Sequence, residues 1–162
     1  MTPRRLVLLI CAVYAAAFAT IACSGAGGDA TPTTTAAAAP ATTPGGLTPF
    51  QVEHGIGPVT APVTVAAAVD ATMAKKGATL FEQKCSACHK MGERYVGPAL
   101  GEVTKRRTPA FVMNMVLNPQ GMVEKHPVTK KLLGEFFVQM PNQQLTQEEA
   151  RTVVEYLRTQ AH

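Results

Sequence analysis

The sequence of 162 residues lacks several features that point to common classes of protein. No stretch alternates apolar and polar residues as a half-buried strand does, so we expect no β-sheet. The apolar run from Leu6 to Ala19 has 14 residues, too short for a comfortable membrane span. There are only four cysteines: Cys11, Cys23, Cys85 and Cys88. These absences leave a helical protein whose chemistry has to be sought in a few residues.

Positive charge is absent from a long part of the chain. Between Cys23 and Thr72 there are three acidic residues and no lysine or arginine. From Met73 onward there are 13 basic and 8 acidic residues, which gives a net charge of +5. A basic folded region steers association towards an acidic partner protein and makes it depend on salt. A solvated surface without a partner and a surface for anionic lipid are the alternatives.

The stretch Cys85-Ser86-Ala87-Cys88-His89 carries the strongest chemical signal. Its pattern, Cys-x-x-Cys-His, is the attachment motif of a c-type haem. Two thiols at this spacing can add across the vinyl groups of a porphyrin, and the histidine that follows can then ligate the iron. We therefore predict that Cys85 and Cys88 hold one covalent haem c and that His89 is an axial ligand. No thiol is then left for a disulfide.

Other uses of a Cys-x-x-Cys pair fit this sequence less well. A zinc ribbon needs a second such pair or a pair of histidines, and neither is present. A thioredoxin-type redox pair stands where a strand meets a helix, and no strand pattern precedes Cys85. The motif therefore favours haem attachment.

The N-terminus is typical of an export signal, which is expected because haem attachment of this type takes place outside the cytoplasm. Arg4 and Arg5 provide the positive charge before the apolar run. The run ends in Thr20-Ile21-Ala22-Cys23, which resembles the cleavage site of a bacterial lipoprotein. Residues 1–22 would then be removed as a signal peptide, and lipid on Cys23 would hold the protein at a membrane. An ordinary signal peptide and an uncleaved anchor are the alternatives.

Two segments separate this signal from the folded domain. Residues 23–49 are mostly Ala, Thr, Gly and Pro without apolar periodicity, and such a composition cannot offset the entropy of ordering the chain. We predict a disordered tether there. Residues 50–72 contain more apolar residues, and we expect an extended segment that wraps along the domain. Within it, His54 is a haem ligand, a docking residue or an exposed polar side chain.

The remaining residues, 73–162, are predicted to form four or five helices. One spans Ala74 to Lys84 and leads into the cysteine motif. Thr108-Pro109 begins a helix that ends at Leu117, and a further helix spans Val128 to Phe137. A capping box, Thr146-Gln147-Glu148-Glu149, begins the last helix. The folded region is therefore expected to be all-α.

The order of these parts resembles the class I c-type cytochromes. The resemblance implies a cytochrome c fold around a covalently attached haem, in which the first and last helices cross with Gly77 and Phe81 facing Tyr156. In that family a proline that follows the haem histidine accepts a hydrogen bond from its other ring nitrogen. Gly97-Pro98 matches this pattern, so the resemblance implies that Pro98 orients His89 and raises its basicity. An ordinary loop proline is the alternative.

Five methionines follow His89 and are candidates for the second axial ligand: Met91, Met113, Met115, Met122 and Met140. Met91 is too near the histidine to reach the opposite face easily. Met113 and Met115 stand on a predicted helix and are more typical of core or surface, whereas Met122 lies in a loop. Met140-Pro141 precedes the last helix and resembles the distal-ligand motif of small class I cytochromes, so Met140 is the expected ligand. His126 is the remaining candidate, and a surface position is the alternative for it.

With both axial positions occupied, the iron can only change its oxidation state, so we expect electron transfer and no catalysis. The resemblance implies a membrane-tethered monohaem carrier between a quinol-oxidising complex and a terminal reductase or oxidase. Lipid on Cys23 would place it in a bacterial periplasm or on the cell surface. Class I cytochromes surround an exposed haem edge with lysines. The candidates here are Lys84, Lys90, Lys105, Arg106 and Arg107.

Further motifs are similar to lipoprotein cytochromes associated with nitrous-oxide reductase or cytochrome oxidase. They are Tyr95–Leu100, Arg106–Pro109, Met113–Met115, Leu117–Pro119 and Met140–Gln143. We expect a monomer that docks on the acidic face of a redox partner and does not bind nucleic acid. Two alternatives are a haem sensor or catalytic domain with an open distal site, and a fixed cytochrome subunit of a larger oxidoreductase.

Overall fold

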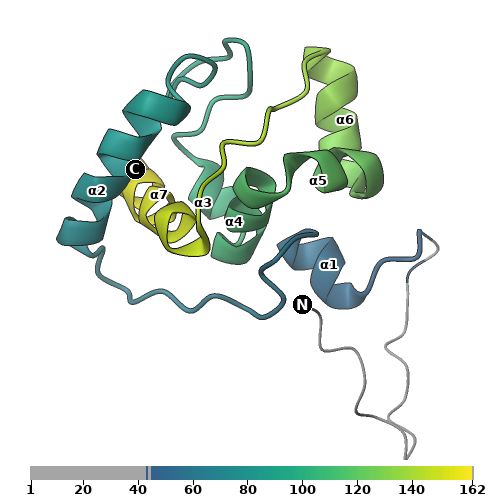
Figure 1. Cartoon of the computed structure of the whole chain (residues 1–162), viewed down its shortest axis with the longest axis horizontal. Helices are drawn as coiled ribbons and strands as arrows, with labels where there is room; N and C mark the ends of the chain where they lie inside the picture. The colour runs from purple at the N-terminus through teal and green to yellow at the C-terminus, as the bar shows by residue number, and fades with distance from the viewer. Residues whose placement is uncertain (1–42, 44, 162) are drawn as a thin grey trace, which may run out of the picture. The chain divides into compact units, whose positions relative to one another are not determined.

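The computed structural model describes residue 43 and residues 45–161 (Figure 1). The predicted signal peptide, Cys23 and most of the predicted tether lie outside the described residues. The described residues form seven helices and no strand, as an all-α domain should. The helices are α1 (Pro49–His54), α2 (Ala71–Lys84), α3 (Val103–Arg106), α4 (Pro109–Leu117), α5 (Pro119–Lys125), α6 (Pro127–Phe136) and α7 (Gln147–Thr159). Among these seven, none is both long and apolar enough to cross a membrane.

The close crossing of α2 and α7 is the main packing contact of the domain (Figure 1). Gly77 makes it possible, because a Cβ atom at this position would overlap the carbonyl oxygen of Thr152 on α7. One turn further along α2, the ring of Phe81 lies against that of Tyr156, with 5.3 Å between their centroids. The crossing expected from the sequence, with Gly77 and Phe81 facing Tyr156, is therefore confirmed.

Three of the predicted helix starts are confirmed by their caps. The Thr108 side chain accepts a hydrogen bond from the Phe111 amide at the start of α4, with Pro109 in the first turn. Thr146 and Glu149 form the predicted capping box of α7. Hydrogen bonds from the Thr146 backbone and side chain lower the pKa of the Glu149 carboxyl group. The third start is that of α6, which begins at Pro127, within one residue of the prediction.

The number of helices expected for residues 73–162, four or five, is too low, because six helices, α2 to α7, form there. The pair Asn118-Pro119 marks the end of α4, as predicted, but it also begins α5. The Asn118 side chain accepts a hydrogen bond from the Gly121 amide, and proline is well suited to the first turn of a helix. The other unexpected helix of this region is α3, which has too few residues to show an apolar periodicity. The short helix α1 lies before the region for which the number was predicted.

The folded region begins earlier than the sequence suggests. Leu47, which falls within the predicted tether, is buried. Thr48 and Gln51 form a capping box, so that residues 49–54 are helical where an extended segment was expected. The following residues, 55–70, have no regular structure and lie along the other helices.

Asn114 on α4 holds the first part of this irregular segment. Its side chain is fully buried and donates to the carbonyl groups of His54 (3.0 Å) and Val59 (2.9 Å). It also accepts a hydrogen bond from the Val59 amide at 3.0 Å. A single amide thus fixes a loop that has no regular backbone partners of its own, since buried backbone groups must be satisfied.

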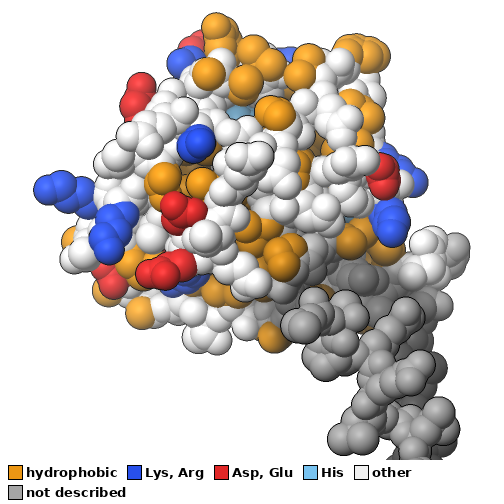
Figure 2. Space-filling model, in the orientation of Figure 1, with side chains coloured by type: hydrophobic (Ala, Val, Ile, Leu, Met, Phe, Trp, Pro, Cys, Tyr) orange, Lys and Arg blue, Asp and Glu red, His pale blue; other side chains and the backbone are white. Residues whose placement is uncertain are grey.

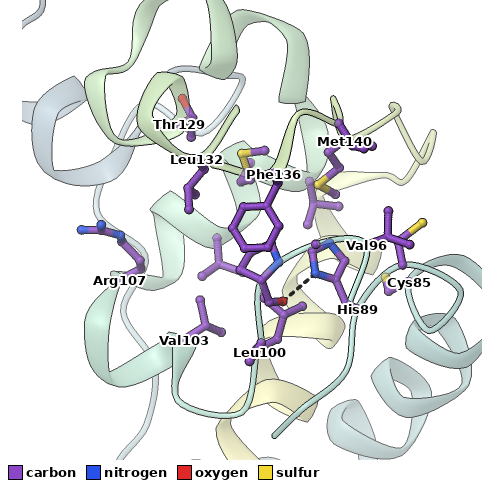
Figure 3. A pocket seen from close by; sticks show the side chains of 18 of the residues that line it. Cys85, His89, Val96, Leu100, Val103, Arg107, Thr129, Leu132, Phe136 and Met140 are labelled. Carbon is purple, nitrogen blue, oxygen red and sulfur yellow. Dashed lines mark hydrogen bonds between the residues drawn. The ribbon is translucent and has the colours of Figure 1, made fainter. Parts of the chain in front are cut away.

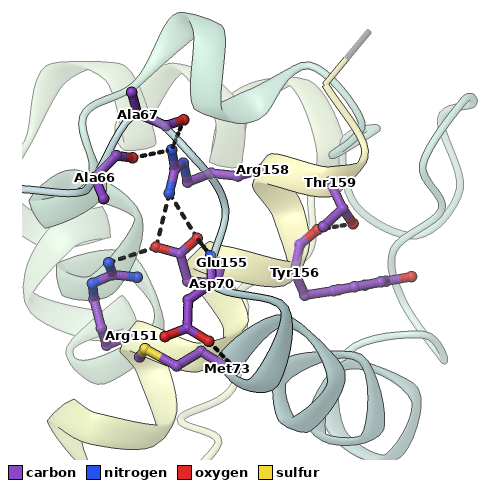
Figure 4. A network of polar contacts seen from close by, with 9 residues as sticks. All are labelled: Ala66, Ala67, Asp70, Met73, Arg151, Glu155, Tyr156, Arg158 and Thr159. Atoms are coloured by element: carbon purple, nitrogen blue, oxygen red, sulfur yellow. Dashed lines mark hydrogen bonds and ion pairs between the residues drawn. The ribbon is translucent and has the colours of Figure 1, made fainter.

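A buried carboxylate holds the second part of the segment (Figure 4). Glu155 on α7 is 1% exposed and pairs with Arg151 and with Arg158, the latter at 2.7 Å. It also accepts a hydrogen bond from the Asp70 amide at 3.3 Å, directly before α2. Arg158 in turn donates to the carbonyl groups of residues 66 and 67. These contacts join the chain before α2 to α7.

We expect Gly77→Ala to lower the free energy of unfolding by roughly 3 kcal/mol, because the added methyl group would push α2 and α7 apart. Gly134→Ala in α6 is the matched control, since nothing lies within 4 Å of a Cβ atom there. That variant should raise the free energy of unfolding by up to about 1 kcal/mol through helix propensity. Denaturant unfolding of both holoproteins checks the prediction, and equal effects of the two substitutions would contradict it.

Candidate functional site

The loop after α2, helices α3, α4 and α6, and the loop before α7 contribute to the lining of one cavity of about 380 Å³ (Figure 3). Its volume is within the range of pockets that hold small molecules and cofactors. Most of its lining is apolar, including Phe81, Val96, Leu100, Val103, Val112, Val116, Leu132, Phe136, Val153 and Leu157. The five residues that the sequence assigns to cofactor binding, Cys85, Cys88, His89, Pro98 and Met140, all line this cavity.

The end of α2 positions the cysteine motif. The helix ends at Lys84, and the carbonyl group of Cys85 accepts hydrogen bonds from the amides of Cys88 (3.0 Å) and His89 (2.9 Å). This tight turn brings both thiols and the imidazole to the wall of the same cavity. The arrangement is suited to thioether bonds with one macrocycle, whose iron would then lie within reach of the histidine.

Burial, and to a lesser extent the neighbouring Cys88 thiol, raise the pKa of the Cys85 thiol to about 11. The group is therefore protonated at neutral pH. Redox-active Cys-x-x-Cys pairs need the opposite, a thiol whose pKa is lowered so that it reacts as the thiolate. The environment of Cys85 thus argues against thioredoxin-type chemistry.

The loop after the motif fixes the orientation of the His89 ring. Its Nδ1 atom donates to the carbonyl oxygen of Pro98 at 3.0 Å. The Gly97 amide donates to the Cys88 carbonyl at 2.8 Å, which holds this loop against the motif. A Cβ atom on Gly97 would lie 2.5 Å from Cε1 of His89, so only glycine lets the ring approach this closely. The other ring nitrogen, Nε2, remains free to ligate an iron in the cavity.

Two of the five candidate methionines, Met115 and Met140, line the cavity. Met140 is half-buried, and Figure 3 shows its side chain directed into the cavity, above His89 in this view. Met113 and Met122 are buried in the core, and the Met122 sulfur accepts a hydrogen bond from the Ile56 amide at 3.0 Å. Met91 packs against the core and does not line the cavity. The sequence did not indicate that Met115 faces the cavity.

The structure gives both other histidine candidates a structural role. His126, the second candidate for the axial ligand, is fully buried and is not a surface residue either. Its Nδ1 accepts from the Val128 amide, and its Nε2 donates to the Val52 carbonyl, so neither nitrogen is free for iron. His54 is half-buried, lies 2.9 Å from the Thr108 hydroxyl through Nδ1, and does not line the cavity. Neither residue is placed as a haem ligand.

More basic than acidic residues line the cavity. Of the five basic residues that the sequence suggested for this rim, Lys84, Arg106 and Arg107 line the cavity, whereas Lys90 and Lys105 do not. Lys131 lines it as well and was missed, because helical periodicity does not tell which neighbour a polar face meets. The only acidic residue of the lining is Glu135. These cations could neutralise the propionate groups of a haem.

Arg94, in the loop after the motif, reaches across to the end of α6. It donates to the Glu135 side chain at 3.0 Å and to the Glu135 carbonyl at 2.7 Å. Its guanidinium also lies 4.1 Å from the centroid of the Phe136 ring. Sequence reasoning could not find this contact, because it joins two segments that only the fold brings together.

The sequence matches the family model described as cytochrome c over residues 74–161. This chain belongs to the cytochrome c family. It is 45% identical to a cytochrome c of Rhodothermus marinus, with a TM-score of 0.66 over 70% of this chain and 97% of that one. An engineered cytochrome c from the same organism, Rma TDE, is 44% identical with a TM-score of 0.65 over the same shares. A search of the curated proteins finds no match.

This cytochrome therefore carries one covalently bound haem c and transfers electrons. The residues of the cavity fit the group: two thiols, an imidazole with one free nitrogen, a thioether and a largely apolar wall meet there. The glycine at position 97 leaves the space that the imidazole needs. The haem supplies an iron that alternates between the ferrous and ferric states, and the protein supplies its ligands and a dry environment.

We expect Gly97→Ala to displace the imidazole from the Pro98 carbonyl. A histidine that donates no such bond is a less basic ligand and stabilises ferric iron less, so the reduction potential should rise. Gly92→Ala is the control, because nothing lies within 4 Å of a Cβ atom there. Voltammetry of the holoproteins, with the Nδ1–H proton of His89 followed by NMR, checks this. An unchanged potential and a retained Nδ1–H signal in Gly97→Ala would contradict it.

Proposed function

We propose that this cytochrome is a membrane-tethered electron carrier between a quinol-oxidising complex and a terminal reductase or oxidase. The observation that supports it best is the shared cavity of His89 and Met140. An imidazole and a thioether can fill both axial positions of one iron. With both positions filled, no site is left for oxygen, peroxide or a substrate, so the protein would act as a carrier and not as an enzyme.

Each residue of the site has a role in this proposal. Cys85 and Cys88 bind the haem covalently, which keeps it in place in both oxidation states. His89 is oriented by the Pro98 carbonyl before the iron binds, so little rearrangement is needed when the charge changes. The Met140 thioether favours ferrous iron and raises the reduction potential. The apolar wall excludes water and limits the solvent reorganisation that electron transfer requires.

The proposed location and partners follow from the sequence and the charge of the domain. We propose that Cys23 carries lipid and holds a monomer at a membrane facing the bacterial periplasm or the outer cell surface. The 13 basic and 8 acidic residues from Met73 onward favour a partner with an acidic face. We propose that the protein is similar in role to the carriers associated with nitrous-oxide reductase or cytochrome oxidase. Nucleic acid is not a proposed partner.

A second candidate function is a haem sensor with a labile distal ligand. The observation that favours it is a further cavity of about 400 Å³ beside Met140, lined also by Asn118, Gln139 and Asn142. A methionine with space on its outer side could leave the iron and admit a gas. Carbon monoxide added to the reduced protein distinguishes the two functions, since a carrier with a firmly bound Met140 shows no spectral change.

Met140→Ala should keep the covalent haem, lose the near-infrared sulfur-to-iron band of the ferric protein and lower the reduction potential, because a thioether stabilises ferrous iron. Met115→Leu is the matched control, since this residue lines the same cavity from α4. Absorption spectra and voltammetry of both variants check the assignment. Loss of the band in Met115→Leu but not in Met140→Ala would show that the wrong methionine was chosen.

The carrier function is tested with membranes of the source organism and the purified holoprotein. A quinol added to the membranes should reduce the wild-type cytochrome, and an oxidised terminal enzyme should reoxidise it. Both rates should fall as salt is added, because charges on the basic domain steer its encounters. The proposed function is ruled out if the membranes neither reduce nor reoxidise the cytochrome faster than it reacts without them.

A further inference from the structure

Helix α6 is held to the rest of the domain mainly at its start. Its only buried residue is Thr129, in the first turn, whose hydroxyl donates to the Met122 carbonyl on α5. His126, which caps the helix, donates to the Val52 carbonyl on α1. Among the described helices, α6 packs mainly against α5. The second half of α6 has no buried residue, and a segment with few buried contacts opens more easily than a packed one.

The loop that carries Met140 begins at the weakly packed end of α6. Phe137 ends the helix, and Met140 follows three residues later. Leu132, Leu133 and Phe136, from the second half of the helix, line the haem cavity. Figure 3 shows Leu132, Phe136 and Met140 in the wall of this cavity. The position of the Met140 sulfur therefore depends on where the end of α6 is held.

Arg94 holds this end through three contacts. Its Nη1 donates to the Glu135 carboxylate at 3.0 Å, and its Nη2 donates to the Glu135 carbonyl at 2.7 Å. Its guanidinium also lies 4.1 Å from the centroid of the Phe136 ring. Within the described part of the chain, no other hydrogen bond joins the second half of α6 to a different segment. Arg94 is thus the polar anchor of the helix end.

The residue types at this contact suit an anchor. The carbonyl of Glu135 is in the last turn of α6, where carbonyl groups have no partner within the helix and a side-chain donor can satisfy them. A carboxylate in the last turn is disfavoured by the helix dipole, and the positive charge of Arg94 offsets this. A planar guanidinium can donate to two oxygens in fixed directions, which an ammonium group does not do.

Apolar contacts alone would not fix the helix end. Figure 2 shows apolar side chains gathered on the upper part of the molecule, over the ends of α2 and α6. The hydrophobic effect has no preferred direction, so such side chains leave the position of the helix end loosely defined. The hydrogen bonds of Arg94 define it, because they are directional.

We propose that Arg94 is a positioning residue that keeps Met140 on the haem iron. It lies in the same loop as Pro98, which orients His89, and so it links the loops that carry the two axial ligands. The proposal rests on Met140 as the distal ligand, which is part of the proposed function. The alternative is an exposed ion pair with Glu135 that contributes little.

The test is a titration of the ferric holoprotein with imidazole. The imidazole nitrogen replaces the thioether sulfur on the iron, and nothing is oxidised or reduced. The apparent affinity for imidazole rises with the fraction of protein in which Met140 has left the iron. Arg94→Gln should lower the imidazole concentration that removes half of the sulfur-to-iron band about tenfold.

Lys105→Gln is the matched control. It also removes one positive charge and one exposed ion pair, that of Lys105 with Glu102 at 2.9 Å, and Lys105 does not line the cavity. This variant should need the same imidazole concentration as the wild type. An equal effect of Lys105→Gln and Arg94→Gln would show that only the charge matters, and it would overturn the proposal.

Two substitutions at the contact separate the anchor from a simple ion pair. Arg94→Lys keeps the charge but not the paired hydrogen bonds, so its imidazole affinity should lie between those of the wild type and Arg94→Gln. Glu135→Gln should have a smaller effect than Arg94→Gln, because the bond to the backbone carbonyl and the contact with Phe136 remain. Wild-type affinity in Arg94→Lys, or equal effects of Arg94→Gln and Glu135→Gln, would contradict the anchor.

A Met140→Ala background shows whether Arg94 acts through the methionine. Without a thioether to displace, Arg94→Gln should leave the imidazole affinity unchanged, as followed by the absorption of the haem. Amide hydrogen exchange gives a second readout. In the single variant Arg94→Gln it should become faster in the second half of α6 and stay as in the wild type in α2 and α7, since the opening is local.

The proposal is overturned if Arg94→Gln keeps the wild-type imidazole affinity, or if its effect persists in the Met140→Ala background. It is also overturned if hydrogen exchange becomes faster in α2 and α7 as much as in α6, because Arg94 would then stabilise the whole domain. A sulfur-to-iron band that is absent from the wild type, or that survives Met140→Ala, removes Met140 as the ligand and the proposed function with it. Failure of the anchor alone leaves that band and its loss in Met140→Ala intact.

Discussion

The contact between α2 and α7 is the constraint on which the site depends. The absence of a side chain at Gly77 lets the two backbones meet, and the Phe81–Tyr156 pair fills the next turn. The haem-binding motif follows directly on the end of α2, and Met140 stands in the loop that leads to the start of α7. The two groups proposed to ligate the iron therefore lie in the loops that are attached to the two crossing helices. A change in the crossing would alter the distance between them.

Besides the apolar core, two buried polar side chains hold the structure together. Asn114 and Glu155 are both buried, and each holds one part of the irregular segment 55–70 against the helices. Strain is found instead beside the site. The only described residues other than glycine with positive φ are Phe137 and Gln144, on either side of Met140. Strained backbone of this kind is often kept for function.

Much of the fold could be predicted because its signals are local. Thr108-Pro109 and the capping box at Thr146 specify helix starts through bonds between near neighbours. The same reasoning failed at Asn118-Pro119, where one pair of residues both ends a helix and begins the next. Short helices lack the periodicity that reveals longer ones. The burial of His126 could not be recognised, because the partner of its Nε2 atom, the Val52 carbonyl, is distant in the sequence.

The sequence by itself determined the covalent attachment of one haem, since the chemistry of Cys85, Cys88 and His89 is contained in five consecutive residues. It also determined that the domain is helical, because capping and periodicity act within a few residues. Only the tertiary structure decided which methionines reach the cavity, where Arg94 is held, and that Phe137 is exposed. Those properties depend on which distant segments meet, and no local pattern in the chain encodes that meeting.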